Sequence, residues 1–370
     1  MKEDCIFCKI AQGEIPSKTV YEDKDYRAIL DIAPAEKGHV IILSKSHSDD
    51  MFDLSEAEAS KVFLIAKRIG QALKDTLHCD GINILQNNGS VYGASFDSLF
   101  MVRHTCAKTT EERNQQRGSK YVQSDINHIF KPINDDLNNG LQVLLTGTPC
   151  QIAAILGFLE NRNTNMDKLI TCDIICHGVC SPMIWEKYLE YIKERYGGIR
   201  NINFRDKKIG SGYNMTIDTT NALYQRHENQ DPFIKIFELN YALRPSCFNC
   251  EMKTINRLGD ITIGDFHKAK QYFPEYNDGS GISVVFINSE KGKNFFETTK
   301  GELEYKECVL EQAMQPNLYM QIELPKEREK FFDLISRKPF IYVMKKYTEL
   351  GFKNYIFGSL KRVAKKILKR

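Results

Sequence analysis

Hydrophobic and polar residues alternate over short segments near the start of the chain, and this two-residue period predicts strands. These strands are expected at residues 19–22, 26–31, 39–43 and 82–86. A helix is predicted between the third and fourth strands, because Ser55 and Glu58 form a capping-box pair and apolar residues then recur at helical spacing as far as Leu77. The pattern predicts a first, α+β module over residues 1–89.

A different order of elements begins at Ser90. A buried strand is expected at residues 141–145, a helix at 151–159, a second strand at 169–175, and a second helix after Ser181-Pro182. Such alternation predicts parallel strands in an α/β domain over residues 90–290, and a mainly helical tail follows over 291–370. The predicted fold class is therefore α/β, with an α+β fragment, a domain with a partly parallel sheet, and a helical basic tail.

The composition is that of an ordinary globular protein: the 370 residues are 42% hydrophobic and 27% charged. No apolar run reaches the roughly 18 residues of a membrane span, and the first residues lack the apolar segment of a secretory signal. We therefore expect a cytoplasmic protein.

Positive charge is concentrated at the end of the chain. Residues 337–370 contain 11 of the 51 Lys and Arg residues but 1 of the 48 Asp and Glu residues, a net charge of +10. Apolar residues at helical spacing from Ile356 to Leu368 predict a basic amphipathic helix. We expect this helix to contact an anionic membrane surface, which would make the protein membrane-peripheral, or an acidic partner; the alternative is that it packs on its own domain. Elsewhere the sequence has no basic patch with interleaved aromatic residues, so no nucleic-acid partner is predicted.

Eleven cysteines in a cytoplasmic protein are expected to be reduced, so clustered ones suggest metal ligands. Cys5 and Cys8 have the spacing with which two thiolates hold one zinc ion, and His39 and His47 are close enough in sequence to add ligands. The alternative is a pair of buried thiols, because cysteine also packs as a small hydrophobic residue.

Two later cysteines are expected to share one edge of the predicted sheet, and two more complete a set of four thiols that one cluster or metal could use. Cys150 and Cys176 each follow the carboxyl end of a strand, where such sheets bind ligands. Cys247 and Cys250 form a second Cys-x-x-Cys pair. The spacing leaves three alternatives open: an iron-sulfur cluster, structural zinc, or unliganded thiols. His177, beside Cys176, is a candidate acid or base, or else a hydrogen-bonded structural residue.

The same edge has features of an anion site. Arg117, Ser119 and Lys120 place a guanidinium, a hydroxyl and an ammonium around a glycine, and such groups hold phosphates. Gly147 and Thr148 precede a predicted helix, whose first N–H groups also suit an anion. For Arg117 and Lys120 the alternative is ion pairing at the surface.

Motifs of the first module resemble those of histidine triad nucleotide hydrolases and transferases, the HIT family. In order, they are Asp4-Cys-Ile-Phe-Cys-Lys-Ile10, Gly13-Glu-Ile-Pro-Ser-Lys18, Val20-Tyr-Glu-Asp23, Leu30-Asp-Ile-Ala-Pro34, Gly38-His-Val40 and Asn87-Asn-Gly89. The resemblance covers residues 4–89. It implies that Asp31 binds ribose hydroxyls of a nucleotide, and that Cys5, Cys8 and His47 are three ligands of a zinc ion.

The defining His-x-His-x-His segment of that family, which supplies its nucleophile, is absent. Only His104 lies in the region where the segment is expected. Without a nucleophilic imidazole no covalent nucleotidyl intermediate can form, so we predict that hydrolase activity is absent. The fourth zinc ligand is expected to be lost with the segment, and the remaining sheet is expected to keep an unpaired edge.

A second set of motifs resembles the beta subunit family of coenzyme F420 hydrogenase/dehydrogenase, over residues 90–345. They are Val91-Tyr-Gly-Ala94, Arg117-Gly-Ser-Lys-Tyr-Val-Gln-Ser124, Gly147-Thr-Pro-Cys-Gln-Ile152, Asp173-Ile-Ile-Cys-His-Gly-Val179, Ser181-Pro182, Asn203-Phe-Arg-Asp-Lys207, Leu243-Arg-Pro-Ser-Cys247 and Asp260-Ile-Thr-Ile-Gly-Asp-Phe266. The resemblance implies a flavin- and iron-sulfur-dependent oxidoreductase, whose bacterial relatives are often associated with genes of surface polysaccharide biosynthesis.

The resemblance also implies site residues and a partner. The implied ligands of a [4Fe-4S] cluster are Cys150, Cys176, Cys247 and Cys250, and the implied lining of an FAD site is Arg117, Ser119, Lys120, Gly147 and Thr148. The implied partner is an electron donor protein or a reduced coenzyme.

The chain departs from this second family in three respects. It lacks the ferredoxin-like run of Cys-x-x-Cys motifs with which such bacterial members usually begin, so electron input is predicted to be impaired. Cys180 stands where the family usually has proline, and His267 where it usually has tryptophan.

The two resemblances meet abruptly, because no Pro- or Ser-rich linker follows Gly89. We interpret the chain as part of a HIT protein fused to part of a flavin oxidoreductase, by gene fusion or by sequence assembly; a non-enzymatic remnant is the alternative.

Overall fold

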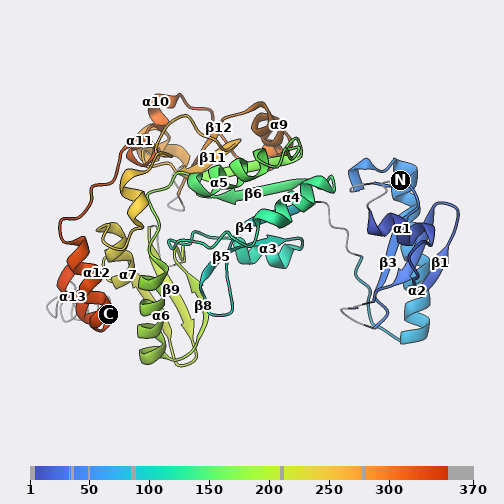
Figure 1. Ribbon diagram of the computed structural model, residues 1–370, viewed down its shortest axis with the longest axis horizontal. Coiled ribbons are helices and arrows are strands. Elements are labelled where there is room, and N and C mark those ends of the chain that lie inside the picture. Colours follow the sequence, from blue (N-terminus) through green and yellow to red (C-terminus); the bar gives the residue numbers. More distant parts are fainter. Residues whose placement is uncertain are drawn as a thin grey trace. The chain divides into compact units, whose positions relative to one another are not determined.

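The computed structural model describes residues 5–348, except residues 33, 35–36, 49–50, 85–88, 209–211 and 277–280. The chain divides into two compact units. The first unit contains residues 1–90 with 131–143 and 163–169, and the second contains 91–130, 144–162 and 170–370. Figure 1 labels the helices and strands. The basic helix expected from Ile356 to Leu368 lies outside the described residues.

A three-stranded antiparallel sheet forms the centre of the first unit, in the order β1-β2-β3. The elements are α1 (Ile6–Gln12), β1 (Thr19–Glu22), β2 (Tyr26–Leu30), β3 (Val40–Ser44), the 3-10 helix η1 (Met51–Asp53) and α2 (Glu56–Leu77). Tyr26 pairs with Ser44 and Leu30 with Val40, so β2 lies between the other two strands. The first three strands predicted from alternation therefore form close to their expected positions.

The predicted capping box is confirmed at the start of α2. The Ser55 hydroxyl accepts a hydrogen bond from the Glu58 N–H, and the Glu58 carboxylate accepts one from the Ser55 N–H at 2.9 Å. Both bonds satisfy backbone donors that the first turn of a helix leaves unpaired. The buried Tyr26 donates its hydroxyl to the Glu58 carbonyl at 3.0 Å, and this bond ties the sheet to the helix.

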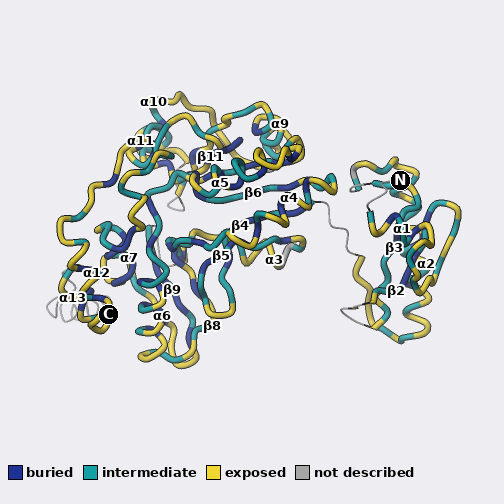
Figure 2. The backbone as a smooth tube through the Cα atoms, in the orientation of Figure 1, coloured by how far each residue is buried: buried dark blue, intermediate teal, exposed yellow. Residues whose placement is uncertain are grey.

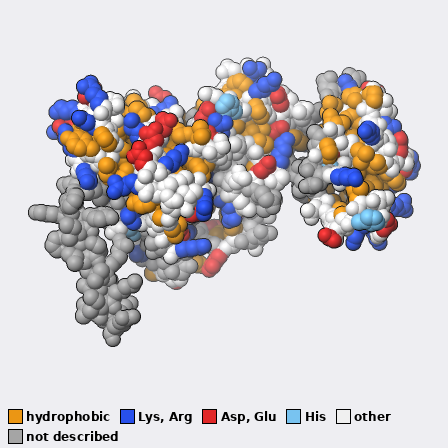
Figure 3. Space-filling model, turned by 90° about the horizontal axis from the view of Figure 1, so that it is seen from below, with side chains coloured by type: hydrophobic (Ala, Val, Ile, Leu, Met, Phe, Trp, Pro, Cys, Tyr) orange, Lys and Arg blue, Asp and Glu red, His pale blue; other side chains and the backbone are white. Residues whose placement is uncertain are grey.

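The strand expected at residues 82–86 does not form in its described part, residues 82–84. A strand needs a hydrogen-bonded neighbour, and these residues find none in the β1-β2-β3 sheet. Ile84 is instead 57% exposed, and Phe63 and Leu64 of α2 are also exposed. The first unit thus leaves apolar side chains at its surface (Figure 3).

A six-stranded mixed sheet, in the order β12-β11-β7-β6-β4-β5, forms the centre of the second unit. Its strands are β4 (Ser90–Phe96), β5 (Val102–Ala107), β6 (Val143–Gly147), β7 (Leu169–Ile174), β11 (Ile261–Asp265) and β12 (Ser283–Ile287). β11 runs parallel to β7 and antiparallel to β12, while β4 and β5 are antiparallel. The prediction of a partly parallel sheet is therefore confirmed.

A second, antiparallel sheet has the order β10-β9-β8. Its strands are β8 (Ile199–Asn203), β9 (Asn214–Thr219) and β10 (Leu223–His227). The remaining elements are α3 (Thr110–Gln116), α4 (Phe130–Asn138), α5 (Pro149–Glu160), α6 (Pro182–Tyr196), α7 (Pro232–Glu238), η2 (Pro245–Asn249), α8 (Ala269–Tyr272), η3 (Pro274–Tyr276), α9 (Glu290–Thr299), η4 (Lys300–Glu302), α10 (Leu310–Ala313), α11 (Pro316–Tyr319), α12 (Arg328–Arg337) and α13 (Phe340–Tyr347).

The largest apolar core lies between this second sheet and helices α6, α7, α12 and α13 (Figure 2). Trp185 and Tyr188 of α6 are fully buried in it, as is Phe233 of α7. Phe331 of α12 and Val343 of α13 belong to the same cluster. The described part of the helical tail therefore packs on its own domain through its apolar residues.

His104 of β5 is a buried polar residue of the second unit, 3% exposed. Its Nε2 lies 2.9 Å from the Thr146 carbonyl oxygen and its Nδ1 lies 2.8 Å from the Ser124 hydroxyl. A carbonyl oxygen only accepts, so Nε2 carries the proton and Nδ1 accepts from Ser124. Burial lowers the pKa of His104 to about 4.

Acid is therefore expected to destabilise the second unit through His104. The unfolded chain binds this proton near pH 6.5 and the folded chain near pH 4, so the free energy of unfolding should fall by about 3 kcal/mol as the pH decreases across that window. In His104→Gln this contribution should vanish, whereas His227→Gln, at an exposed position, should retain it. Urea unfolding at pH 7 and pH 4.5 measures the difference, and equal pH dependence in wild type and His104→Gln would contradict the assignment.

Candidate metal and cofactor sites

Cys5, Cys8 and His47 form a compact group in the first unit. Cys5 precedes α1 and Cys8 lies on its buried side, while His47 follows β3. All three ligand atoms lie within 4.8 Å of one another, and Cys8 Sγ lies 3.2 Å from His47 Nδ1. A tetrahedral zinc ion would hold sulfur and nitrogen about 3.6 Å apart, so these three residues fit zinc without a large movement.

No fourth histidine, cysteine or carboxylate joins this group within the described part of the chain. His39, which the sequence offers as a further ligand, instead pairs with Asp31, at 3.1 Å between Nδ1 and Oδ2. Asp31 also donates its backbone N–H to the His39 carbonyl at 3.1 Å. The predicted nucleotide-binding carboxylate is thus held at the end of β2 by the residue before β3.

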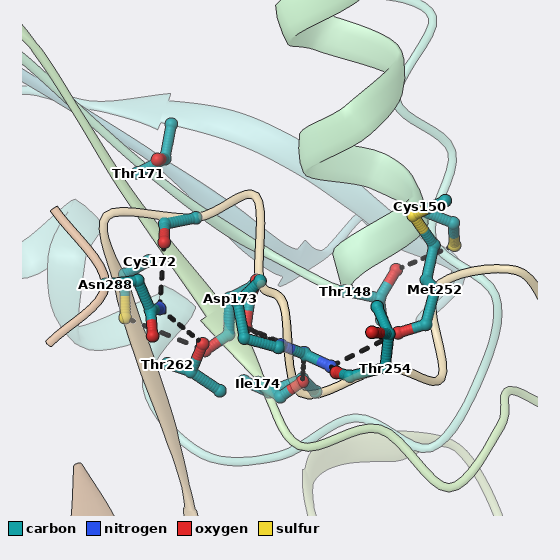
Figure 4. Close-up of polar contacts among 12 residues, drawn as sticks. Thr148, Cys150, Thr171, Cys172, Asp173, Ile174, Met252, Thr254, Thr262 and Asn288 are labelled. Carbon is teal, nitrogen blue, oxygen red and sulfur yellow. Dashed lines mark hydrogen bonds and ion pairs between the residues drawn. The ribbon is translucent and has the colours of Figure 1, made fainter. Parts of the chain in front are cut away.

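The four later cysteines line one cavity of about 290 Å³ in the second unit. Cys150 lies in the first turn of α5, which follows β6, and Cys176 lies just after β7. Cys247 lies in η2 and Cys250 directly follows that element. Thr148, predicted as part of an anion site, lies beside them, with its hydroxyl 3.2 Å from Cys150 Sγ (Figure 4). Three segments far apart in the sequence therefore meet at the edge that the strand pattern predicts.

Hydrogen bonds hold the third of these segments in place. The Gln321 amide accepts from the Cys250 N–H at 3.0 Å and donates to the Cys250 carbonyl at 2.9 Å. Burial raises the pKa of the Cys247 thiol, and the backbone of Val179 opposes that rise. The bonds of Gln321 tie the loop that carries these two cysteines to the segment after α11, and the Arg244 N–H ties its start to the Val179 carbonyl at 3.0 Å.

The spacing of the sulfur atoms bears on the zinc alternative for this cavity. Four thiolates around one zinc ion lie about 3.8 Å apart. Of the described residues, only Cys5, Cys8 and His47 form a group whose ligand atoms are all within 4.8 Å. The four cavity cysteines are therefore spread more widely than one zinc ion requires, and they would have to move closer to share one.

The electrostatics of the cavity favour an anionic group. Burial raises the pKa of Cys176 to about 12, with further increases from Cys150 and Cys247, and Lys253 opposes them. Thiols in such surroundings ionise only when positive charge, such as that of metal ions, is added. The lining includes two cations, Arg244 and Lys253, and one carboxylate, Glu251, while Arg257 is paired with Asp173.

His177 also lines the cavity. Its Nε2 lies 2.7 Å from Asn240 Oδ1 and its Nδ1 lies 3.3 Å from Asn317 Oδ1. Both ring nitrogens are thus engaged by asparagine side chains. This arrangement matches the structural alternative for His177 more closely than a role as acid or base.

Of the residues predicted for the flavin site, Thr148 lines the cysteine cavity and the other four lie outside its lining. Arg117 and Ser119 are exposed, whereas the Lys120 ammonium donates to the carbonyls of Gln116, Arg117 and Gly118 at 3.2–3.3 Å. Burial lowers the pKa of Lys120 to about 8, and its charge acts on His104. A Cβ on Gly147 would lie 3.3 Å from His104 Nε2, so Lys120 and Gly147 lie around the same histidine.

Two family models match the chain. The HIT domain model matches residues 12–129, and the model for the C terminus of the coenzyme F420 hydrogenase/dehydrogenase beta subunit matches residues 140–310. A HIT-like protein of Methanocaldococcus jannaschii is 44% identical over 89 residues, which is 24% of this chain and 68% of that protein. The first part of the chain belongs to the HIT family.

Other HIT relatives agree with this assignment. The protein hit of Bacillus subtilis is 40% identical over 93 residues, covering 25% of this chain and 64% of that protein. The adenosine 5'-monophosphoramidase of Saccharomyces cerevisiae is 34% identical over 127 residues, covering 34% of this chain and 77% of that protein. The chain spans about two thirds of the length of these curated HIT relatives. The HIT part is fused to a domain of the coenzyme F420 hydrogenase/dehydrogenase beta subunit type.

Solved structures of both kinds are similar to parts of the chain. A zinc-bound histidine triad family protein of Mycobacterium smegmatis has 36% identity and a TM-score of 0.23, over 23% of this chain and 63% of that chain. The F420-reducing [NiFe] hydrogenase complex of Methanosarcina barkeri has 18% identity and a TM-score of 0.38, over 58% of this chain and 67% of that chain.

The residues that support these sites carry no sequence signature. Gln321 and Arg257 position the cavity loop, and neither belongs to a motif. His104, which stands alone in the region expected to hold the HIT nucleophile, is a buried structural residue in β5. The only signal for Arg257 is its place between the second Cys-x-x-Cys pair and the Asp260 motif, which is too weak to assign a role.

Zinc is expected to bind the Cys5, Cys8 and His47 group of the HIT part. Cys8→Ser and His47→Gln each remove one of the three ligands, so each variant should bind one zinc ion fewer per chain than wild type, at zinc concentrations that saturate wild type. Competition with a chromophoric chelator measures the stoichiometry. Cys79→Ser is the matched control and should bind as wild type does; unchanged zinc binding by Cys8→Ser would contradict the assignment.

Proposed function

We propose that residues 90–345 form a flavin- and iron-sulfur-dependent oxidoreductase module of the coenzyme F420 hydrogenase/dehydrogenase beta subunit type. The observation that carries the proposal is that Cys150, Cys176, Cys247 and Cys250 line one cavity, with thiols spread more widely than one zinc ion needs. The match of residues 140–310 to that family supports it. The module is expected to lie in the cytoplasm.

In this proposal the four cysteines hold a [4Fe-4S] cluster, which when bound supplies one-electron transfer. The chain's own groups set its surroundings. Arg244 and Lys253 provide positive charge beside the thiolates, and such charge favours the reduced, more negative state of a cluster. The backbone of Val179 lowers the pKa of the Cys247 thiol and so favours its thiolate form.

The proposed FAD site lies around Lys120 and Gly147, with Arg117, Ser119 and Thr148. Lys120 is a half-buried cation whose ammonium donates to backbone carbonyls, so a phosphate would supply the counter-charge that these partners lack. A Cβ on Gly147 would lie 3.2 Å from Gln151 Oε1 and 3.3 Å from His104 Nε2, so a side chain there would be tightly packed. An electron donor protein or a reduced coenzyme is the proposed partner, and the missing ferredoxin-like segment limits electron input.

A second function is favoured by the HIT part. We propose that it retains nucleotide binding without hydrolysis, because it keeps Asp31 at the end of β2 and lacks the His-x-His-x-His nucleophile. Calorimetric titration with a purine nucleotide tests this proposal. Asp31→Asn is expected to bind the nucleotide more weakly than wild type, and a wild-type protein that binds no nucleotide would rule the function out.

We also propose that the basic tail contacts an anionic membrane surface. Loss of vesicle binding after removal of residues 349–370 is the test.

Iron and sulfide content is the direct test of the oxidoreductase proposal. The anaerobically purified full chain should contain about four iron and four sulfide ions together with a flavin absorption band. Cys247→Ser removes a cavity thiol and should lose most of the iron, whereas Cys308→Ser, at an exposed cysteine outside the cavity, should retain it. Wild-type protein with zinc and no iron would contradict the proposal.

Flavin affinity is expected to depend on the protonation of Lys120. The pKa of this ammonium is about 8, so its positive charge is lost as the pH rises through about 8, and FAD binding by wild type should weaken over that range. Lys120→Arg keeps its charge at higher pH and should bind FAD with little change between pH 7 and pH 9. Flavin fluorescence titrations measure both affinities; parallel pH profiles for the two proteins would exclude this role.

A further inference from the structure

Arg257 joins two of the segments that line the cysteine cavity. Its side chain lines the cavity and is only 3% exposed. Nη1 donates to the carbonyls of Met252 at 3.2 Å and Thr254 at 3.5 Å, in the loop after the second Cys-x-x-Cys pair. Nη2 donates to the Ile174 carbonyl at 3.0 Å, two residues before Cys176 (Figure 4). One guanidinium therefore bonds the end of β7 and the cysteine loop together.

Asp173 of β7 supplies the charge that compensates Arg257. Its Oδ1 accepts from Nη2 at 2.8 Å and from Nε at 3.3 Å, and its side chain is 0% exposed. Its other oxygen, Oδ2, is buried, has no hydrogen-bond partner among the described residues, and lies against Gly259, where a Cβ would approach it to 2.9 Å.

The cost of this arrangement indicates that it has a purpose other than stability. A buried ion pair contributes little net stability compared with apolar residues of the same volume, and an unpartnered carboxylate oxygen adds a further cost. What the pair does provide is geometry, because guanidinium offers five donors in a fixed plane and here they reach four different acceptors.

We propose that Arg257 and Asp173 are positioning residues for the metal centre of the cavity. The guanidinium sets the separation between Cys176 and the loop that carries Cys247 and Cys250. Asp173 orients the guanidinium and neutralises it, so that the bridge adds no net charge beside the centre. The inference rests on the proposed function, and neither residue is a ligand.

Two single substitutions separate geometry from charge. Arg257→Lys keeps the charge but replaces the planar fork by one ammonium that cannot reach all four acceptors, so iron should be lost to a chelator about tenfold faster, with the midpoint potential unchanged. Asp173→Asn keeps the shape but leaves the Arg257 charge uncompensated, so the midpoint potential should rise above that of wild type.

A double variant guards against simple unfolding. Asp173→Asn with Arg257→Met removes both buried charges and should fold, because no uncompensated charge remains. It should still lose iron about tenfold faster than wild type, since the bonds to the three carbonyls are gone. Arg226→Lys on the edge strand β10 is the matched control for an Arg-to-Lys change and should retain iron as wild type does.

All proteins are compared as anaerobically purified full chains, by iron release to a chelator, redox titration and circular dichroism. Two results together support the inference. Arg257→Lys and the double variant release iron faster than wild type while their circular dichroism stays native, and the midpoint potential is raised in Asp173→Asn alone. If Arg257→Lys and the double variant both release iron at the wild-type rate, the inference is overturned and the proposed function stays intact. A wild-type protein without iron overturns the proposed function, and this inference with it.

Discussion

The buried guanidinium of Arg257 holds together parts of the chain that the sheet alone cannot align. Strands β6 and β7 bring Cys150 and Cys176 to one edge, because both cysteines follow the ends of neighbouring strands. The loop with Cys247 and Cys250 is tied at its start to the segment after β7, by a bridge between Cys180 and Leu243 and by the Arg244 N–H, which donates to the Val179 carbonyl at 3.0 Å. Beyond that point its backbone is bonded by two side chains, Arg257 from within the loop region and Gln321 from the tail.

Much of this architecture could be predicted from local sequence signals. The capping box at Ser55, the strands of the first unit and the partly parallel sheet follow from periodicity and short motifs, which depend on neighbouring residues. The placement of Cys150 and Cys176 also follows, because the end of a strand is visible in the sequence. By contrast, the strand expected at residues 82–86 failed in its described part, since a strand depends on a partner that the sequence does not specify.

The supporting residues could not be predicted for a related reason. Arg257 and Asp173 lie 84 positions apart in the sequence, and His104 meets Thr146 42 positions later. A single sequence does not indicate which residues form such pairs, because charged and polar residues of these types are mostly found on solvated surfaces. Their roles become visible only when burial and hydrogen bonds are known.

The fusion explains the contrast between the two units. The chain spans about two thirds of the HIT relatives, and its first unit has a three-stranded sheet with exposed apolar residues such as Ile84 and Phe63. The second unit has a large core in which α12 and α13 of the tail take part. The second unit therefore retains the packing that a buried cofactor site needs, while the HIT part retains ligand groups on a reduced sheet.

X-ray absorption of the anaerobically purified full chain, at both the iron and the zinc edges, tests the central claim most directly. The account predicts an iron edge with sulfur ligands and a second shell of neighbouring iron atoms, which only a multinuclear cluster gives. Zinc should be confined to the site with two sulfur ligands and one nitrogen ligand. A zinc edge with four sulfur ligands, together with no iron, would contradict it.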